Sequence, residues 1–445
     1  MQSIPQSTAD SIDILRHALD LHTSGQMAAA EQIYRDVLSQ HPMQPVALHY
    51  LGICLHQRGL HEEAIDLIRL SCSLQSDNAD WCNALGNVMF ALQRFAEASV
   101  AYQAALQLDA GAHEVWNNLG SSQLQQGEPL AAMVSFEMAL AIDPDFAPAL
   151  LHMSSILQAA GQTVEAVKFQ CRAYVLPPHD DKPKKMLGVC FYFLGRYQEA
   201  AAIYRAWMEQ EPGNPIAAHL FAASAQISVP GRASDAYVEA YFDDYAATFD
   251  AQLLDGLAYR GPQLIAAALR SLPAPAWRYE VLDIGCGTGL CGAVLAPYAS
   301  RLTGVDLSAG MLAKAGEQAH YHALVKDEIC SFMSGKSAVY DLIVAADTMI
   351  YFGDLLPVLA AVSQALRPGG WFIFTLECSD DDNLPESGHQ LHASGRYRHR
   401  REYVERLLRE VDCPLLQLSA ETLREEVRQP VAGMLVIARR APAPV

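Results

Sequence analysis

One acidic residue and three glycines are closely spaced in the segment VLDIGCGTGL at 281–290. Asp283 precedes Gly285, Gly287 and Gly289, and glycines at alternate positions let the backbone pass close to a ligand where a strand gives way to a helix. Seventeen residues after Gly289 comes Asp306, which ends a second apolar stretch and could accept both hydroxyl groups of a ribose. The pattern predicts a nucleoside site. Because position 290 is not a glycine, a pyrophosphate cradle is the weaker interpretation.

The surrounding sequence predicts the elements that position these groups. After the break at 229–234, residues 235–256 carry apolar and aromatic side chains at helical spacing. From Trp277 onward short apolar strands alternate with helical stretches, the strands being EVLDIG, RLTGVD, DLIVAAD, WFIFTLE and AGMLVIARR. This alternation predicts an α/β fold with a parallel, doubly wound, Rossmann-like sheet, whose ligand lies at the carboxyl ends of the strands.

These motifs resemble those of class I S-adenosylmethionine-dependent methyltransferases, over about residues 235–440. The resemblance implies that the glycine loop, including Cys286, holds the methionine half of S-adenosyl-L-methionine, with Asp283 on its ammonium side. Asp306, with Leu307 beside it, matches the acid that binds the ribose. Asp327, with Glu328 beside it, matches the acid that bonds the adenine amino group. YDLIVAAD and LRPGGWFIF match the later motifs of the family in order and spacing.

The segments FDDYAATFDAQL, YRGPQL and GRYRHRREY look like those of bacterial methyltransferases that carry an N-terminal repeat array. In that group the helix before the sheet commonly folds over the cofactor. Tyr245 and Phe249 are therefore candidates to cover the sulfonium, which an aromatic face stabilises. The alternative is that these two side chains only fix the helix to the sheet.

Methyl transfer from a sulfonium is an in-line displacement, so the protein must mainly align the reactants and exclude water. Cys286 is expected to be a small filler because no cation in the sequence nearby would lower its pKa. If the acceptor is a hydroxyl or an ammonium group, a base must take its proton. The candidates are Asp347, which the resemblance places at the transfer site, then Tyr351, His392 and His389.

Other features of this half restrict the acceptor. AADTMIYF lacks the Asn/Asp-Pro-Pro-aromatic motif of methyltransferases that act on adenine or glutamine amino groups. The tract Arg396–Arg401 is densely basic, and it could hold an acidic group of the acceptor or form a solvated helix start.

The first half of the chain contains an internal repeat of 34 residues. Glycines recur five residues before most of the repeated alanines, and Gln93 replaces the glycine in one unit. Each unit is predicted to form two antiparallel helices, with small residues where the helix axes approach and a glycine in the turn. The repeated alanines are Ala30, Ala64, Ala98, Ala132, Ala166 and Ala200.

These units resemble the tetratricopeptide repeat, so the expected fold is an α-helical solenoid followed by the α/β methyltransferase domain. The expected boundaries are 11–228 for six repeats and a capping helix, 229–234 for a linker and 235–440 for the second domain. The family implies a groove that binds a protein or peptide. Asn83, Asn87, Asn117 and Ser121 fall on the groove face, either to bond a peptide backbone or as solvated side chains.

The composition excludes several other classes of function. The chain has 50 acidic and 31 basic residues, for a net charge of −19, which disfavours binding to nucleic acid or an anionic membrane. Its ten cysteines never fall as CxxC, so neither a metal site nor a disulfide framework is expected. The N-terminus lacks the pattern of a signal peptide, and a cytoplasmic location is expected.

The sequence therefore predicts a methyltransferase whose repeats recruit or position the acceptor, which is either protein-borne or a small molecule. One alternative is an interaction scaffold whose second domain binds cofactor without turnover. A nicotinamide dehydrogenase is a second alternative, which the glycine spacing disfavours. Every cofactor motif lies after Gly231, so a fragment of about 232–445 is expected to bind the cofactor alone.

Overall fold

The computed structural model describes residues 6–246, 249–251, 253, 256–273, 277–378 and 385–442. The chain forms two compact units, Met1–Leu176 and Pro177–Val445. None of the helices within the described ranges is long and apolar enough to cross a membrane.

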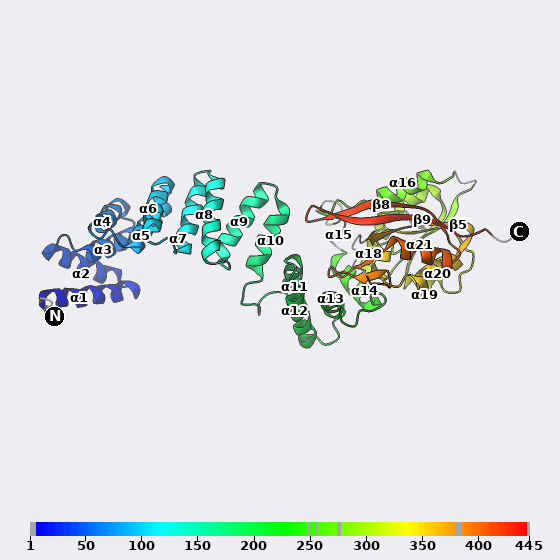
Figure 1. The fold of residues 1–445 in the computed structure, drawn as a ribbon, viewed down its shortest axis with the longest axis horizontal. Coiled ribbons are helices and arrows are strands. Elements are labelled where there is room, and N and C mark those ends of the chain that lie inside the picture. Colours follow the sequence, from blue (N-terminus) through cyan, green and yellow to red (C-terminus); the bar gives the residue numbers. More distant parts are fainter. Residues whose placement is uncertain are drawn as a thin grey trace. The chain divides into compact units, whose positions relative to one another are not determined.

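The first unit consists of paired helices that repeat every 34 residues, as the sequence predicts (Figure 1). Alanines of the repeat are fully buried where paired helices meet, and at Gly86 and Gly120 a side chain would overlap the rings of Tyr102 and Phe136. The helices are α1 (Gln6–Thr23), α2 (Met27–Gln40), α3 (Pro45–Gln57), α4 (His61–Leu74), α5 (Ala79–Ala91), α6 (Phe95–Leu108), α7 (His113–Gln125), α8 (Pro129–Ile142), α9 (Ala147–Ala159) and α10 (Thr163–Tyr174).

The turns within the repeats explain the recurring glycine. Gly59 and Gly127 have φ angles of 84° and 77°, in the left-handed region that glycine adopts without a steric penalty. Gln93, which stands where the pattern lacks its glycine, has a φ of 60°. The third repeat therefore keeps the same turn with glutamine, for which a left-handed backbone conformation is less favourable than for glycine.

The second unit begins inside the repeat array. It contains α11 (Lys184–Phe193) and α12 (Tyr197–Gln210), which form the sixth repeat, and then α13 (Pro215–Ala225). A side chain at Gly188 would overlap the ring of Tyr204, which is the contact seen in the earlier repeats. The domain boundaries at 228 and 235 stay a prediction, but the sixth repeat packs in one unit with the sheet.

A nine-stranded sheet forms the centre of this unit, in the order β3-β2-β1-β4-β5-β7-β6, with β9 pairing both β5 and β8. Neighbouring strands from β3 to β5 are parallel, which confirms the predicted doubly wound fold. The strands are β1 (Tyr279–Ile284), β2 (Ala299–Asp306), β3 (Ala323–Lys326), β4 (Tyr340–Ala345), β5 (Leu366–Cys378), β6 (His389–Leu391), β7 (Tyr397–His399), β8 (Leu415–Glu426) and β9 (Gln429–Arg439).

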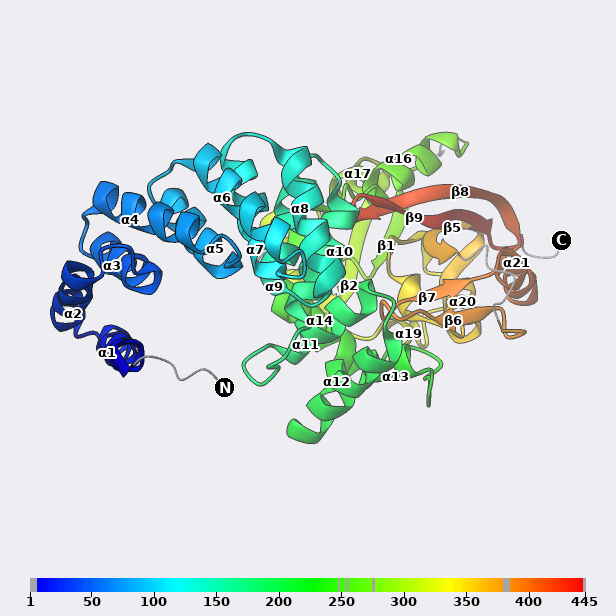
Figure 2. The same ribbon diagram turned by 60° about the vertical axis from the view of Figure 1, so that its left-hand side comes forward.

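The end of the sheet differs from the all-parallel prediction. β9 runs antiparallel to β5, and β8 and β9 form one long hairpin (Figure 2). Val427 and Arg428 join these two strands with φ angles of 51° and 59°. Two consecutive positive φ angles turn the chain tightly back on itself, so the last two strands must be antiparallel.

Helices cover both faces of the sheet. One core lies between the sheet and α19 (Ile329–Met333), α20 (Leu356–Ala365) and α21 (Arg401–Glu410), and the other lies under α16 (Gly261–Ser271) and α17 (Gly292–Leu295). The remaining helices, α14 (Asp235–Tyr245), α15 (Phe249–Ala251) and α18 (Ala309–Glu317), belong to the candidate site.

Candidate active site

The glycine loop after β1 takes a backbone conformation that its three glycines make possible. Gly285, Gly287 and Gly289 all have positive φ angles, between 53° and 87°. A side chain at Gly285 would overlap Thr348, whereas one at Gly287 would meet open space. Gly287 therefore leaves its backbone accessible to a ligand from the adjacent cavity.

Asp306 ends β2 and fixes this loop. Its Oδ2 accepts a hydrogen bond from the Gly287 backbone N–H at 2.9 Å, and its Oδ1 accepts one from the Ser308 N–H at 2.8 Å. The side chain is buried, which raises its pKa, while the backbone N–H groups act in the opposite direction. Each carboxylate oxygen has two lone pairs, so both can still accept a ligand hydroxyl.

Asp283 is the more deeply buried acid, with 1% of its surface exposed. Burial raises its pKa to about 7, although the Tyr321 hydroxyl donates a hydrogen bond to Oδ2 at 2.7 Å and acts in the opposite direction. The ion pairs between described residues do not include Asp283. A cationic ligand group would supply the positively charged partner that this buried carboxylate lacks.

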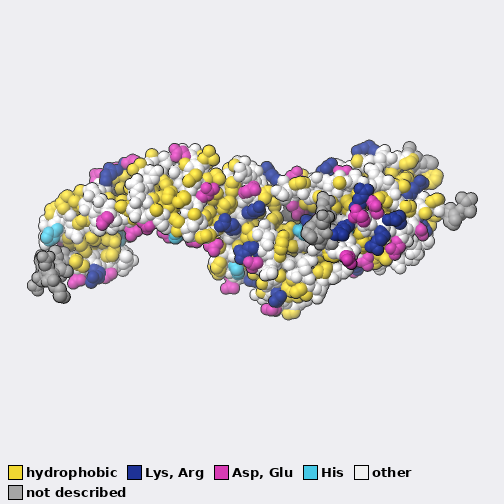
Figure 3. All heavy atoms as spheres, in the orientation of Figure 1, with side chains coloured by type: hydrophobic (Ala, Val, Ile, Leu, Met, Phe, Trp, Pro, Cys, Tyr) yellow, Lys and Arg dark blue, Asp and Glu magenta, His cyan; other side chains and the backbone are white. Residues whose placement is uncertain are grey.

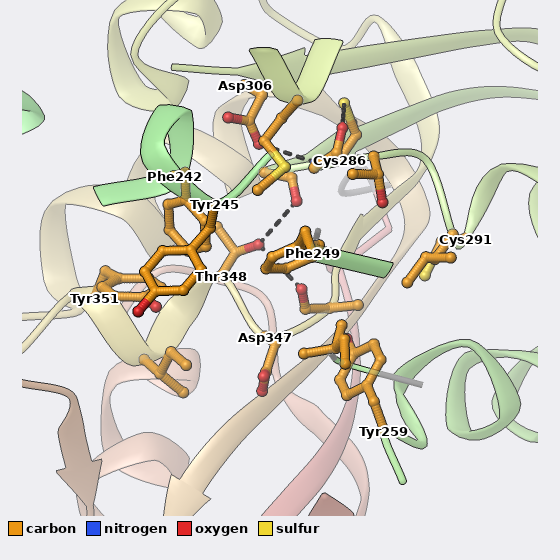
Figure 4. Close-up of a pocket in the computed structure, with 18 of the residues that line it drawn as sticks. Phe242, Tyr245, Phe249, Tyr259, Cys286, Cys291, Asp306, Asp347, Thr348 and Tyr351 are labelled. Atoms are coloured by element: carbon orange, nitrogen blue, oxygen red, sulfur yellow. Dashed lines mark hydrogen bonds between the residues drawn. The ribbon is translucent and has the colours of Figure 1, made fainter. Parts of the chain in front are cut away.

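These groups line a cavity of about 290 Å³ at the carboxyl ends of β1, β2 and β4. Figure 4 shows Asp306 and Cys286 on one side, Asp347 on another, and a group of aromatic side chains around them. The aromatic residues are Tyr241, Phe242, Tyr245, Phe249, Tyr259 and Tyr351. The cavity thus combines charged groups with a mostly apolar wall, as ligand sites commonly do.

The helices α14 and α15, here called the lid, are held to the sheet by three acidic side chains. Asp243 accepts hydrogen bonds from Ser308 Oγ and from the Gly310 N–H, so it adds a charge at the N-terminus of α18. Asp250 accepts one from Thr288 Oγ1 at 2.5 Å. The third contact joins Glu239 to Lys326 at 2.6 Å. The lid is therefore attached to both predicted cofactor motifs.

Asp347 follows β4 and is held by two neighbours. Its backbone N–H donates to Thr375 Oγ1 at 2.8 Å, and its Oδ2 accepts a hydrogen bond from Arg424 Nη1 at 2.7 Å. Its Oδ1 is buried without a hydrogen-bond partner among the described residues. Burial raises the pKa of Asp347, and Arg424 acts in the opposite direction. One oxygen is thus fixed, and the other can accept a hydrogen bond from a ligand.

Arg424 belongs to a network of charges that the sequence did not reveal. It bonds Asp347, Glu377 and Glu426, and Arg396 bonds the same two glutamates. Burial alone would raise the pKa of Glu377, but the arginines lower it to about 2. Arg396 was within the predicted basic tract, but Arg424, on the C-terminal hairpin, had no distinguishing signal.

The basic tract divides into two parts. Arg396 lines the cavity, and Arg398 Nε lies 3.6 Å from Glu377 Oε2. Arg401 instead begins α21 and pairs with Glu405, four residues later. Figure 3 shows Lys and Arg side chains interspersed with Asp and Glu over this helix. The outer part of the tract is thus a mixed charged surface.

Several predicted site residues lie together at the cavity, and others do not. Those that line it are Asp283, Gly285, Cys286, Gly287, Asp306, Tyr245, Asp347 and Tyr351. Those outside its lining are Gly289, Leu307, Asp327, Glu328 and His392.

The residues outside the lining have other contacts. Gly289 packs near Tyr321, Asp327 Oδ1 accepts a hydrogen bond from the Glu328 N–H, and Glu328 caps α19 through the Ser331 N–H. The His392 Nδ1 bonds Ser394, and its ring contacts Tyr192 on α11. His392 therefore does not reach the site as the predicted base.

Burial raises the pKa of the Cys286 thiol well above its ordinary value, and the charges of Asp283 and Asp306 act in the same direction. A thiol in this environment is not a reactive nucleophile. This agrees with the expectation that Cys286 fills space in the loop.

Comparison with known families confirms the two resemblances that the motifs indicated. A family model described as a methyltransferase domain matches residues 282–372. Models described as TPR or tetratricopeptide repeat match residues 15–79, 86–127 and 113–146. The chain therefore combines tetratricopeptide repeats with a methyltransferase domain.

Two curated relatives are O-methyltransferases. The ubiquinone biosynthesis O-methyltransferase of Aromatoleum aromaticum is 30% identical over 103 residues, which cover 22% of this chain and 43% of the relative. The malonyl-[acyl-carrier protein] O-methyltransferase of Salmonella typhimurium is 34% identical over 108 residues, which cover 24% of this chain and 41% of the relative. The chain thus spans less than half the length of either protein.

Among solved structures, the chain is similar to the N-methyltransferase NodS of Bradyrhizobium japonicum, in complex with S-adenosyl-L-homocysteine. The identity is 20% and the TM-score 0.37, and the match covers 46% of this chain and 98% of NodS.

Proposed function

We propose that this chain transfers a methyl group from S-adenosyl-L-methionine to an acceptor, and that the cofactor binds in the cavity beside the glycine loop. The observation that carries the proposal is the arrangement of two buried acids, Asp283 and Asp306, around Gly287, where a side chain would enter open space. The matched methyltransferase model begins at Leu282 and so includes this loop.

The chemistry of these residues fits the cofactor at both ends. Asp306 retains lone pairs for the two ribose hydroxyls, and Asp283 lacks a cationic partner that the cofactor's ammonium group would supply. The aromatic rings of the lid, including Tyr245 and Phe249, provide faces that stabilise a sulfonium. Asp327 and Glu328 stay predictions for the adenine end.

The bound cofactor supplies an electrophilic methyl group whose departure leaves a neutral thioether. The residues of the chain align the acceptor and exclude water. Asp347 is the proposed acceptor-positioning residue, because its Oδ1 is buried without a hydrogen-bond partner among the described residues, and Arg424 fixes the other oxygen. An acceptor hydroxyl or ammonium group donates to Oδ1 and can leave its proton there. Tyr351 lines the same cavity.

The repeats are proposed to recruit or position a protein-borne acceptor. Two of the predicted groove residues belong to a polar cluster: Asn118 Nδ2 donates to Asn83 Oδ1 at 3.3 Å and to Asn87 Oδ1 at 3.4 Å. A third predicted groove residue, Asn117, is buried. Asn87 Oδ1 also accepts a hydrogen bond from the Tyr102 hydroxyl. Amide groups held in this way offer their remaining donors to an extended peptide backbone.

Two measurements test the proposal. Titration calorimetry of the full chain is expected to show binding of S-adenosyl-L-methionine and of S-adenosyl-L-homocysteine, and a folded chain that binds neither contradicts the cofactor assignment. Incubation with methyl-labelled cofactor and a cell lysate is expected to label an acceptor, which mass spectrometry then identifies. Binding without formation of S-adenosyl-L-homocysteine would support the alternative of a scaffold that no longer turns over.

A further inference from the structure

The first helix of the sixth repeat, α11, contacts the lid through one lysine. The Lys185 ammonium nitrogen lies 4.8 Å from the ring centre of Tyr241 and 4.5 Å from that of Tyr245. The same nitrogen lies 3.5 Å from Asp244 Oδ2. These three lid residues lie in the C-terminal half of α14, and both tyrosines line the cavity. Lys185 is thus one side chain away from the site.

Lys185 occupies a repeat position that is predicted to face the peptide groove in other repeats. Asn83, Asn117 and Lys185 each stand three residues before a glycine of the 34-residue pattern, so they occupy the same place in their repeats. In the third and fourth repeats this place belongs to the face that is predicted to bind a peptide. In the sixth repeat the side chain at this place contacts α14. The lid therefore contacts the face of the sixth repeat that corresponds to the predicted peptide-binding face of the third and fourth repeats.

Three further contacts join this repeat and its following helix to segments that adjoin the cavity lining. The ring centre of Tyr192, two turns after Lys185, lies 5.8 Å from that of His392. On α13, the His219 ring stacks on Tyr237 of the lid at 3.8 Å, and its Nε2 bonds the Gly395 carbonyl oxygen at 2.8 Å. Gly395 directly precedes Arg396, which lines the cavity.

We infer that the sixth repeat is a structural part of the methyltransferase site, and that Lys185 is the residue that positions the lid tyrosines over the cavity. The inference rests on the proposed function for the identity of the ligand. A cation over the face of an aromatic ring is attracted to the negative charge density of that face. Because Lys185 contacts two rings, its loss is expected to weaken cofactor binding about five- to thirty-fold.

The test compares Lys185→Met, which keeps the length of the side chain without its charge, with Lys185→Arg, which keeps the charge. Calorimetry of the full chain with S-adenosyl-L-homocysteine is expected to show the loss in the first variant and recovery to within about threefold of wild type in the second. Lys184→Met is the matched control, because the neighbouring ammonium group bonds the His179 carbonyl oxygen and not the lid. Hydrogen exchange of residues 235–245 is measured on the same proteins without ligand.

Faster exchange of this segment in Lys185→Met, with wild-type exchange in Lys185→Arg and in the control, supports the inference even if no cofactor binds. In that case only the proposed function fails. Wild-type binding together with unchanged exchange in Lys185→Met overturns the inference and leaves the proposed function intact. Should Lys185→Met not fold, Asp244→Asn removes the ion pair from the lid side and is judged by the same two measurements.

Discussion

The buried charge network around Arg424 allows us to predict how much the loss of this arginine lowers the free energy of unfolding, and how that loss depends on pH. Arg424 is 3% exposed and bonds three carboxylates, so Arg424→Gln leaves Asp347 and Glu377 with fewer positive partners. The lowering of the Glu377 pKa from 4.5 to about 2 corresponds to about 3 kcal/mol of folding stability, to which Arg396 and Arg398 also contribute. Removal of one partner of a buried pair typically costs about 3–5 kcal/mol. We expect Arg424→Gln to lower the free energy of unfolding at pH 7 by about 3 kcal/mol.

The sign of the pH dependence follows from the lowered pKa of Glu377. Its contribution is fully present above the unfolded value near 4.5 and is lost as the pH falls toward about 2. In the variant, protonation of the unpaired carboxylates begins at higher pH. The difference in stability between wild type and variant should therefore be largest above about pH 5 and become smaller below it.

The assay must report on the second unit alone. Three of the five tryptophans, Trp207, Trp277 and Trp371, lie in that unit, so replacing Trp81 and Trp116 with phenylalanine in every protein confines the fluorescence signal to it. Urea denaturation at pH 7 and pH 4 then gives the free energies.

The matched control is Arg428→Gln, an exposed arginine on the same hairpin, which is expected to change stability by less than about 0.5 kcal/mol. An Arg424→Gln variant as stable as this control at pH 7, or one whose deficit does not shrink at pH 4, would refute the reasoning.

Three other predictions concern the ligands. Asp306→Ala should weaken cofactor binding by about 2–4 kcal/mol, because hydrogen bonds to a charged group contribute about 1.5–3 kcal/mol each and are not additive. An unchanged dissociation constant would show that another residue holds the ribose. Cofactor binding should strengthen as the pH rises through about 7, where Asp283 becomes ionised. In calorimetry between pH 6 and 8.5, Asp283→Asn should bind the cofactor more weakly and lose this dependence on pH. Alanine replacement of Asn83 and Asn87 in the repeat groove should raise KM for a protein acceptor without changing kcat or cofactor affinity, whereas equal kinetics would exclude recruitment through these two side chains.

The parts of the site that could be predicted from the sequence are those that depend on neighbours along the chain. The glycine loop and Asp306 lie within one strand–helix–strand unit, where residue type and spacing determine the backbone path. The regular period of the repeats likewise predicted the paired helices, and the left-handed turn at Gln93 shows that the period outweighed the missing glycine.

The charge network could not be predicted because its members meet only through tertiary structure. Asp347 and Arg424 are 77 residues apart, and their contact depends on the antiparallel pairing of β9 with β5. It also depends on the pairing of β8 with β9, and the turn between these two strands contains Val427 and Arg428, which are not typical of a tight hairpin turn. His392 was a chemically reasonable base, but it follows a short strand and its ring contacts Tyr192.

The sixth repeat determines where the chain can be divided. A fragment that begins near 232, which the positions of the cofactor motifs suggest, would lack α13, although Ala222 and Ala223 share a buried cluster with Leu391 and Tyr397. It would also lack the Gln226 side chain that bonds the Leu391 carbonyl oxygen. A fragment that begins at Pro177 keeps these contacts. The choice of the first residue therefore decides whether a truncated protein retains the packing of α13 against β6 and β7, which a division near residue 232 would remove.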